Sequence, residues 1–189
     1  MKTMKERNRA SGALAIGVAA ALVLLAAGNA GAQARIDGIQ VADGATLAFT
    51  AKAGEVSTPD GGSIHFWGYQ EDTNIEGLPS GPLPQYPGPT LIMDQGSTVT
   101  INFKSDLPFG PTCSSMVFPG HAVAASGGTA GLLTQESCAV GQVVSYTFTA
   151  TEPGTYTYYS GTQTELQVEM GLVGSIIVRP AGQPDWAYD

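Results

Sequence analysis

Residues 154–178 read GTYTYYSGTQTELQVEMGLVGSIIV and form the most informative part of the chain. The stretch begins with a tyrosine-rich run at 155–158, continues through a polar loop and ends in an apolar run at 174–178. Tyrosine is enriched in strands, and a short apolar run bounded by turn residues is typical of a buried central strand. Residues 166–170 have room for a single helical turn. The stretch therefore predicts two strands joined by a polar loop.

On both sides of this stretch, short runs alternate apolar and polar residues with the period of a half-buried strand. Val99, Ile101 and Phe103 share one face of residues 98–104. Further candidate strands are residues 47–49, 63–69, 91–93, 115–118 and 144–148. The proline-rich run 78–89 is expected to cross the surface, and the glycine- and alanine-rich run 122–134 to form a loop. Many short strands between glycines and prolines predict an all-β sandwich or barrel.

The first 34 residues have the organisation of a secretory signal peptide. Lys2, Lys5, Arg7 and Arg9 form a positive region, residues 13–27 are apolar, and the small-residue sequence AQA occupies 32–34. The apolar run is shorter than the ~20 residues that a membrane-spanning helix needs. We therefore expect cleavage after Ala34, export to the periplasm or the medium, and no membrane anchor after cleavage.

The charge of the chain is strongly acidic. The full chain has eight basic and sixteen acidic residues and a net charge of −8. Without residues 1–34 it keeps four basic and fifteen acidic residues, which gives a net charge of −11. Such a surface repels nucleic acid and anionic lipid. It agrees with simple solubility and also with a surface for cations.

Cys113 and Cys138 are the two cysteines of the chain. An even number of cysteines in an exported chain favours a disulfide. The alternative is that Cys138 is a thiolate ligand of copper, but a blue-copper site also needs two histidines, and none follows Cys138. The sequence therefore predicts a disulfide that closes the irregular middle of the domain.

Three stretches resemble, in the same order, the plastocyanin-like cupredoxin domains of multicopper oxidases. The first is YPGPTL at 86–91 with the strand STVTINFKSDLP at 97–108, and the second is SMVFPG at 115–120. The third is GTYTYYSG at 154–161, followed by GLVGSIIV at 171–178. The resemblance implies a Greek-key cupredoxin sandwich at residues 35–180, the N-terminal domain of a multicopper-oxidase-like protein, followed by a linker-like tail at 181–189.

The same resemblance implies that two copper-ligand pairs are missing. Copper-binding members use His-x-His pairs, whose imidazoles suit copper. Two ligands one residue apart on an extended segment point the same way, so two such segments converge on one cluster. Here Val117 and Pro119 occupy the first pair of positions, and Tyr159 and Gly161 the second. Copper is thus expected for the family, whereas this chain has no complete copper site of its own.

Two histidines remain elsewhere in the chain. His121 follows the first degenerate pair and is the best single candidate for a metal ligand, with an ordinary exposed loop histidine as the alternative. His65 lies in SIHFWG at 63–68, before the YPGPTL segment, so it is out of order for the family and is expected to be a strand residue. Met93 and Met116 lie in strand-like runs and are expected in the core.

These observations favour a structural, docking or assembly module that is not an enzyme on its own. Its partner is expected to be a second cupredoxin domain or another copy of the chain. A first alternative is a copper-dependent oxidase or reductase whose metal ligands are shared between chains or domains. A second alternative is an acidic extracytoplasmic module that binds metal ions or other cations.

Overall fold

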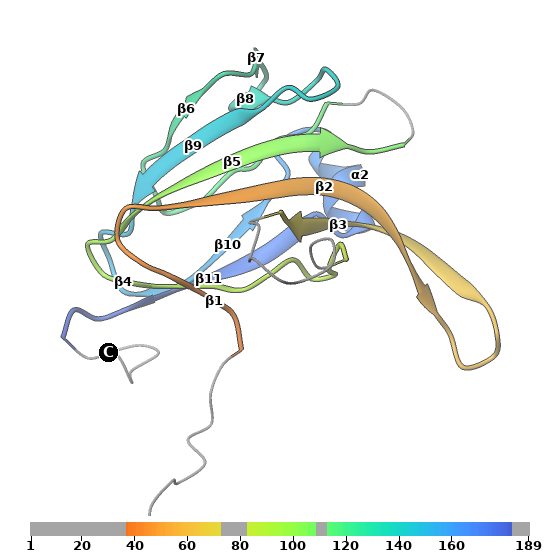
Figure 1. Ribbon diagram of the computed structural model, residues 1–189, viewed down its shortest axis with the longest axis horizontal. Coiled ribbons are helices and arrows are strands. Elements are labelled where there is room, and N and C mark those ends of the chain that lie inside the picture. The colour runs from red at the N-terminus through yellow and green to blue at the C-terminus, as the bar shows by residue number, and fades with distance from the viewer. Residues whose placement is uncertain (1–36, 73–82, 109–112, 183–189) are drawn as a thin grey trace, which may run out of the picture. The chain divides into compact units, whose positions relative to one another are not determined.

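The alternating runs of the sequence form β-strands in the computed structural model, which describes residues 37–72, 83–108 and 113–182 (Figure 1). The predicted signal peptide at 1–34 and residues 183–189 of the predicted tail lie outside these ranges. The described elements are β1 (Ile39–Val41), β2 (Ala45–Ser57), β3 (Ser63–Glu71), β4 (Leu91–Asp94), β5 (Thr98–Asp106), β6 (Ala124–Ser126), β7 (Thr129–Ala130), β8 (Gln135–Glu136), β9 (Val144–Thr149), β10 (Gly154–Tyr159), α2 (Thr164–Met170) and β11 (Val173–Arg179).

Most of the strands belong to two sheets. One has the order β1-β4-β11-β10, and the other has the order β3-β2-β5-β9-β6. In the first sheet β4 runs parallel to β1 and β11, and in the second β2 runs parallel to β5, so the chain crosses between strands that are not consecutive. The short pair β7 and β8 is separate. The predicted all-β sandwich, with its strands at 155–158 and 174–178, is confirmed.

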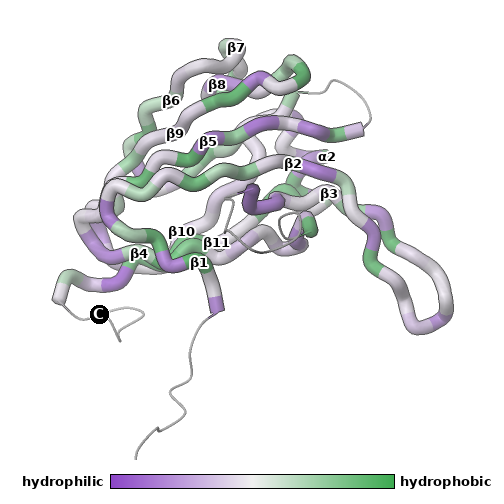
Figure 2. The backbone as a smooth tube through the Cα atoms, viewed as in Figure 1, coloured by the Kyte–Doolittle hydropathy of each residue, from purple (hydrophilic) through white to green (hydrophobic). Residues whose placement is uncertain are grey.

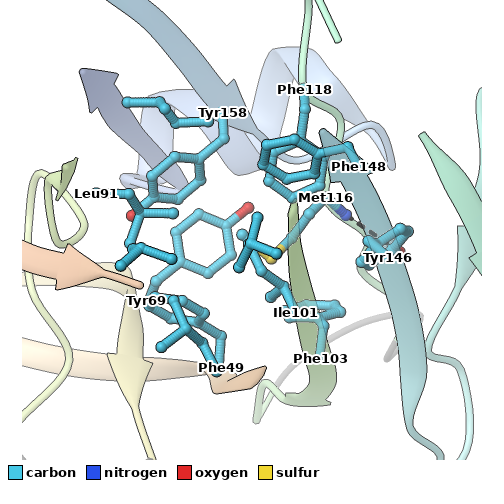
Figure 3. Packing of buried hydrophobic residues seen from close by; sticks show 14 of the residues in the cluster. Phe49, Tyr69, Leu91, Ile101, Phe103, Met116, Phe118, Tyr146, Phe148 and Tyr158 are labelled. Atoms are coloured by element: carbon cyan, nitrogen blue, oxygen red, sulfur yellow. Dashed lines mark hydrogen bonds between the residues drawn. The ribbon is translucent and has the colours of Figure 1, made fainter. Parts of the chain in front are cut away.

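The core lies between the two sheets and is rich in aromatic rings (Figure 3). Tyr69 and Tyr158 from opposite sheets have ring centroids 5.4 Å apart, and Phe118 lies 4.9 Å from Phe148. Met116 is also buried here, and its N–H donates to the Tyr146 hydroxyl at 3.2 Å. Such rings bury large apolar areas, which makes this cluster the main stabilising contact between the sheets.

Three buried tyrosine hydroxyls lie in this core. Burial raises the pKa of Tyr69, Tyr146 and Tyr158, so each stays a neutral phenol at physiological pH. Tyr158 donates to the carbonyl of Pro89 at 2.6 Å, and the N–H of Gly88 donates to a β11 carbonyl at 2.7 Å. Gly88 and Pro89 are therefore buried, and the prediction that all of 78–89 crosses the surface is wrong for these residues.

Three other local predictions differ from the structure. Residues 115–118 form no regular strand, because Ser114 bridges to Ser137 whereas Val117 bridges to Tyr159, and no continuous ladder forms. The predicted loop 122–134 contains β6, whose small residues gain strand geometry by pairing with β9. The expected single turn at 166–170 is a seven-residue helix, α2. No helix within the described ranges is both long enough and apolar enough to span a membrane.

Candidate functional site

The two segments that carry the degenerate ligand positions lie side by side. Val117 and Tyr159 are directly opposite each other, with the Val117 N–H donating to the Tyr159 carbonyl at 2.8 Å and the Tyr159 N–H donating to the Val117 carbonyl at 3.2 Å. Their neighbours Phe118 and Tyr158 point into the core. Because successive side chains of an extended segment alternate, Val117 and Tyr159 point away from the core and form part of one outer face.

Gly161 belongs to the same place, and its lack of a side chain is what lets the segments approach. A Cβ atom at this position would lie 2.7 Å from Cγ1 of Val117 and 3.2 Å from Oγ of Ser115. The exposed Leu133 lies beside them, with its Cβ 3.5 Å from that position. Pro119, the fourth degenerate position, is exposed in the turn that closes when the N–H of His121 donates to the Phe118 carbonyl.

His121 does not face this outer surface. Its ring lies 4.8 Å from that of Phe148 and 4.6 Å from that of Tyr156, measured between centroids. Tyr156 shares the inward face of β10 with the core residue Tyr158, whereas Tyr159 is on the other face. Both ring nitrogens of His121 are buried without a hydrogen-bond partner, and burial lowers the pKa of the imidazole. His121 is therefore neither an exposed loop histidine nor placed next to Val117 and Tyr159.

The left-handed backbone of Gly120 explains how His121 reaches this position. Gly120 has φ of 92°, a conformation that glycine adopts readily, and a Cβ there would lie 2.7 Å from the Tyr156 ring. The turn can therefore close tightly enough to place the imidazole between two aromatic rings. His65 is elsewhere, exposed on β3 opposite Glu55, in agreement with its assignment to a strand.

The predicted disulfide between Cys113 and Cys138 is confirmed, and it rules out Cys138 as a thiolate ligand. The chain on either side is tied together by Ser114 and Ser137, whose backbone N–H groups each donate to the other's carbonyl, at 3.0 and 2.8 Å. The carboxylate of Glu136 lies next to the disulfide, with its Oε2 atom 3.8 Å from Sγ of Cys138. The bridge therefore fixes the base of the segment that leads to Val117.

A buried polar network, which the sequence did not reveal, connects this disulfide to the second ligand segment. Oε1 of Gln167 accepts hydrogen bonds from Ser160 at 2.6 Å and from Ser114 at 2.9 Å. Nε2 of Gln167 donates to the carbonyl of Cys113 at 2.9 Å. Gln167 is on α2 and is 1% exposed, so these bonds form away from water. One amide thus holds together the helix, the disulfide segment and the residue after Tyr159.

A second branch of the network starts from Ser115. Its hydroxyl is 2.9 Å from that of Thr162, and Thr162 in turn donates to Oε1 of Glu136 at 2.8 Å. Because the single proton of Thr162 is used for Glu136, Ser115 is the donor in the first bond. The branch holds a carboxylate next to the disulfide, and it links Ser115 and Thr162, the residues close to Val117 and Gly161.

The residues at the outer face do not fit a copper ion. Val117, Pro119 and Gly161 have no side-chain donor, and the phenol of Tyr159 must lose its proton before it can bind a metal. In the described ranges, one group of three metal-ligating side chains lies close together, Cys113, Glu136 and Cys138. Two of these are bonded to each other, so the group offers a single carboxylate. These side chains do not make up the ligand set of a catalytic copper site.

The strand order and the paired segments define a cupredoxin-type sandwich. A solved structure of copper nitrite reductase from Nitrosomonas europaea matches with a TM-score of 0.53 and 23% identity, over 76% of this chain and 42% of that one. The 2F4 variant of the McoA multicopper oxidase from Aquifex aeolicus matches with a TM-score of 0.56 and 24% identity, over 77% and 29%. At these identities the likeness concerns the fold.

Sequence comparison places the chain in a family. A family model described as multicopper oxidase matches residues 84–183. Multicopper oxidase MCE of Talaromyces pinophilus is 38% identical over 96 residues, which cover 51% of this chain and 15% of that protein. The chain belongs to the multicopper oxidase family. It spans only a fraction of the length of the relatives that it matches.

Proposed function

We propose that this protein is an exported multicopper-oxidase-like cupredoxin domain that serves as a structural, docking or assembly module and has no complete copper site of its own. The direct pairing of Val117 with Tyr159 is the observation that carries this proposal. It supports the proposal because, by the family resemblance, these two segments are the ones that would carry ligands, and they have an aliphatic side chain and a phenol there instead of imidazoles. On this proposal the cupredoxin fold is present, while the side chains at the ligand positions serve contact with a partner instead of metal binding.

The character of the outer face supports a docking role. Leu133, next to Gly161, is 60% exposed, and the adjacent Leu132 is 92% exposed. Leu133 therefore adds an exposed apolar side chain beside Val117 and Gly161, where a metal site would be polar. Exposed clusters of large apolar side chains often mark sites of contact with other proteins. A second cupredoxin domain or another copy of the chain would cover this face.

The proposed organisation follows the family resemblance and the leader sequence. Residues 1–34 are a signal peptide, residues 35–180 are the domain and residues 181–189 are a linker-like tail. Export to the periplasm or the medium agrees with the disulfide, which persists in oxidising compartments. Since the relatives are much longer than this chain, a partner domain agrees with the family pattern.

Copper loading tests the proposal directly. The purified protein is incubated with Cu(II), freed of loosely bound metal by a weak chelator, and measured for copper content, visible absorption and oxidase activity. A His121→Ala variant serves as the matched control. We expect well under one copper per chain, no blue absorption and no difference between the two proteins.

Other results would favour the alternatives. One copper per chain with oxidase or reductase activity would support a site whose ligands are shared between chains or domains, and would overturn the structural role. Tight copper that is lost in the His121→Ala variant would overturn it as well. Weak binding of several kinds of cation, abolished by salt, would instead support an acidic cation-binding module, because salt screens interactions between exposed charges.

A further inference from the structure

The hairpin of β2 and β3 extends well beyond the rest of its sheet (Figure 1). β2 pairs with β5 only from Ala45 to Lys52, whereas its pairing with β3 continues to Ser57. Beyond the part that is packed on the core, residues 55–57 and 63–65 are all exposed and form a ribbon of two strands. A two-stranded ribbon is marginally stable in water when nothing packs against it. This part of the hairpin, called the arm below, is therefore expected to have a partner.

The arm carries exposed apolar side chains where an independent surface would carry charges. Val56 and Ile64 are directly opposite each other on its two strands and are 50% and 60% exposed. Figure 2 shows hydrophobic stretches on both strands of the arm. An apolar pair at the centre of a water-facing ribbon is stabilised only if another surface covers it.

The free edge of β3 has unpaired backbone groups. At the base of the hairpin, the Gln85 N–H donates to the Tyr69 carbonyl at 3.1 Å, so odd-numbered residues of β3 direct their backbone groups to the edge. Ser63 and His65 are the odd-numbered residues of the arm, and both are exposed. No described residue forms a hydrogen bond with their outward N–H and C=O groups. The arm therefore offers two donors and two acceptors in one row.

The exposed part of this edge is short and well defined. From Trp67 onward the edge is covered. Gly171 lies against the Trp67 carbonyl, so close that a Cβ at Gly171 would be 2.3 Å from its oxygen, and Gln85 pairs with Tyr69. Proteins usually block a free edge with lysine, proline or a bulge. Residues 63–66, SIHF, contain neither lysine nor proline. This short row is suited to pairing with another strand.

We propose that the arm edge pairs antiparallel with the same edge of a second copy of this chain, about a two-fold axis at Ile64. In this register Ser63 lies opposite the second copy's His65, and the reverse, which gives four backbone hydrogen bonds. Ile64 lies opposite its counterpart at a closely spaced position without backbone hydrogen bonds. The side chains of Val56 and Ile64 from both copies then form one continuous apolar row across the joined sheet.

The charges at this seam permit a second copy to approach. The chain has a net charge of −8, so two copies repel each other over most of their surface. At the seam His65 is the one ionisable side chain, and it faces the neutral Ser63 of the other copy, while Glu55 is opposite His65 of its own copy. No like charges meet. The two-fold arrangement also closes on itself and leaves no free arm edge.

Cysteine cross-linking tests this register. At a closely spaced antiparallel pair the Cβ atoms are ~4.5–5.5 Å apart, close enough for a disulfide after small adjustments. An Ile64→Cys variant should form covalent dimers under air, seen on non-reducing gels. Val56→Cys is the matched control on the same face, one strand further from the axis, and should give none. Equal cross-linking of the two variants, or none in either, would overturn the proposal.

Association in solution tests the hydrogen bonds separately. Sedimentation of the mature protein up to about 1 mM should show a monomer–dimer equilibrium, since an interface below ~1,200 Å² is weak. His65→Pro removes an outward donor but no bond to β2 and should give monomers with an unchanged melting temperature. His65→Thr keeps the donor and should still dimerise. Persistent dimers of His65→Pro, or wild-type monomers throughout, would refute the pairing.

This inference rests on the proposed assembly role, but its tests do not measure copper. A copper-loaded monomer would overturn both, whereas a copper-free monomer would overturn only the pairing of arms.

Discussion

Replacing Gln167 by alanine should be among the most destabilising single changes in this domain. The amide makes three buried hydrogen bonds, to Ser114, Ser160 and the carbonyl of Cys113. Each is worth ~1 kcal/mol net, and a buried partner left unpaired costs ~1–3 kcal/mol. Because the Ser160 hydroxyl can still donate to the carbonyl of Thr162 at 3.2 Å, the expected loss in free energy of unfolding is about 3–5 kcal/mol, with the lost packing included.

Urea unfolding of the disulfide-intact protein, followed by circular dichroism, measures this loss. For a slope of ~2 kcal/mol per M, the midpoint should fall by about 1.5–2.5 M. Gln167→Met keeps most of the volume and should cost nearly as much as Gln167→Ala if hydrogen bonds dominate. Glu169→Ala, on the exposed side of the same helix, should change stability by less than ~0.5 kcal/mol. A loss below ~1 kcal/mol for Gln167→Ala would show that the network does not hold the segments together.

Three further predictions concern the site and its surroundings. Because burial lowers the pKa of His121, its contribution to stability is complete above the unfolded pKa of about 6.5 and declines as pH falls below that value. A pH series of unfolding free energies should show this decline, and the His121→Phe variant should lack the part of it that His121 causes. An unchanged pH slope in that variant would contradict the assignment. Replacing Cys113 and Cys138 by serine opens a loop with a sequence separation of 25 residues and should cost about 3.5 kcal/mol, measured by urea unfolding. A loss below ~1 kcal/mol would mean that hydrogen bonds alone fix this segment. The double variant Val117→His and Tyr159→His places two imidazoles directly opposite each other and should bind Cu(II) on the order of 100-fold more tightly than either single variant, by calorimetry. Equal affinity of double and single variants would show that the two side chains do not share a metal.

The regular part of the fold is predictable because its strands have either a period-two alternation or a short continuous apolar run. The strand expected at 98–104 is β5, and the run at 174–178 is β11, the apolar strand between β4 and β10. The run 115–118 has a strand-like sequence but bridges two different partners, and local pattern carries no information about a change of partner. The strand β6 forms from Ala124, Ala125 and Ser126 because the edge of β9 is available, which only the tertiary structure shows.

The sequence predicts the positions of the candidate site but not the buried residues that hold its segments in place. The motif order identified Val117, Pro119, Tyr159 and Gly161, and the structure places Val117 against both Tyr159 and Gly161. The burial of His121 depends on two rings that come from different strands, so its sequence neighbours gave no indication. The role of Gln167 cannot be predicted, because α2 is too short for a clear helical period. Nothing in the sequence of 163–169, which contains Gln163 as well as Gln167, indicates which glutamine is buried.

The close approach of Gly161 to Val117 constrains the order in which mutations can accumulate. Position 161 accepts a side chain only after the Cγ1 atom of Val117 has moved, and a β-branched residue has little rotameric freedom to move it. Histidine at 117 is unbranched at Cβ and can turn away, so a change at 117 permits a later change at 161, whereas the reverse order passes through a clash. The two positions are therefore epistatic: a side chain at 161 is tolerated only in a chain whose residue 117 already leaves room for it.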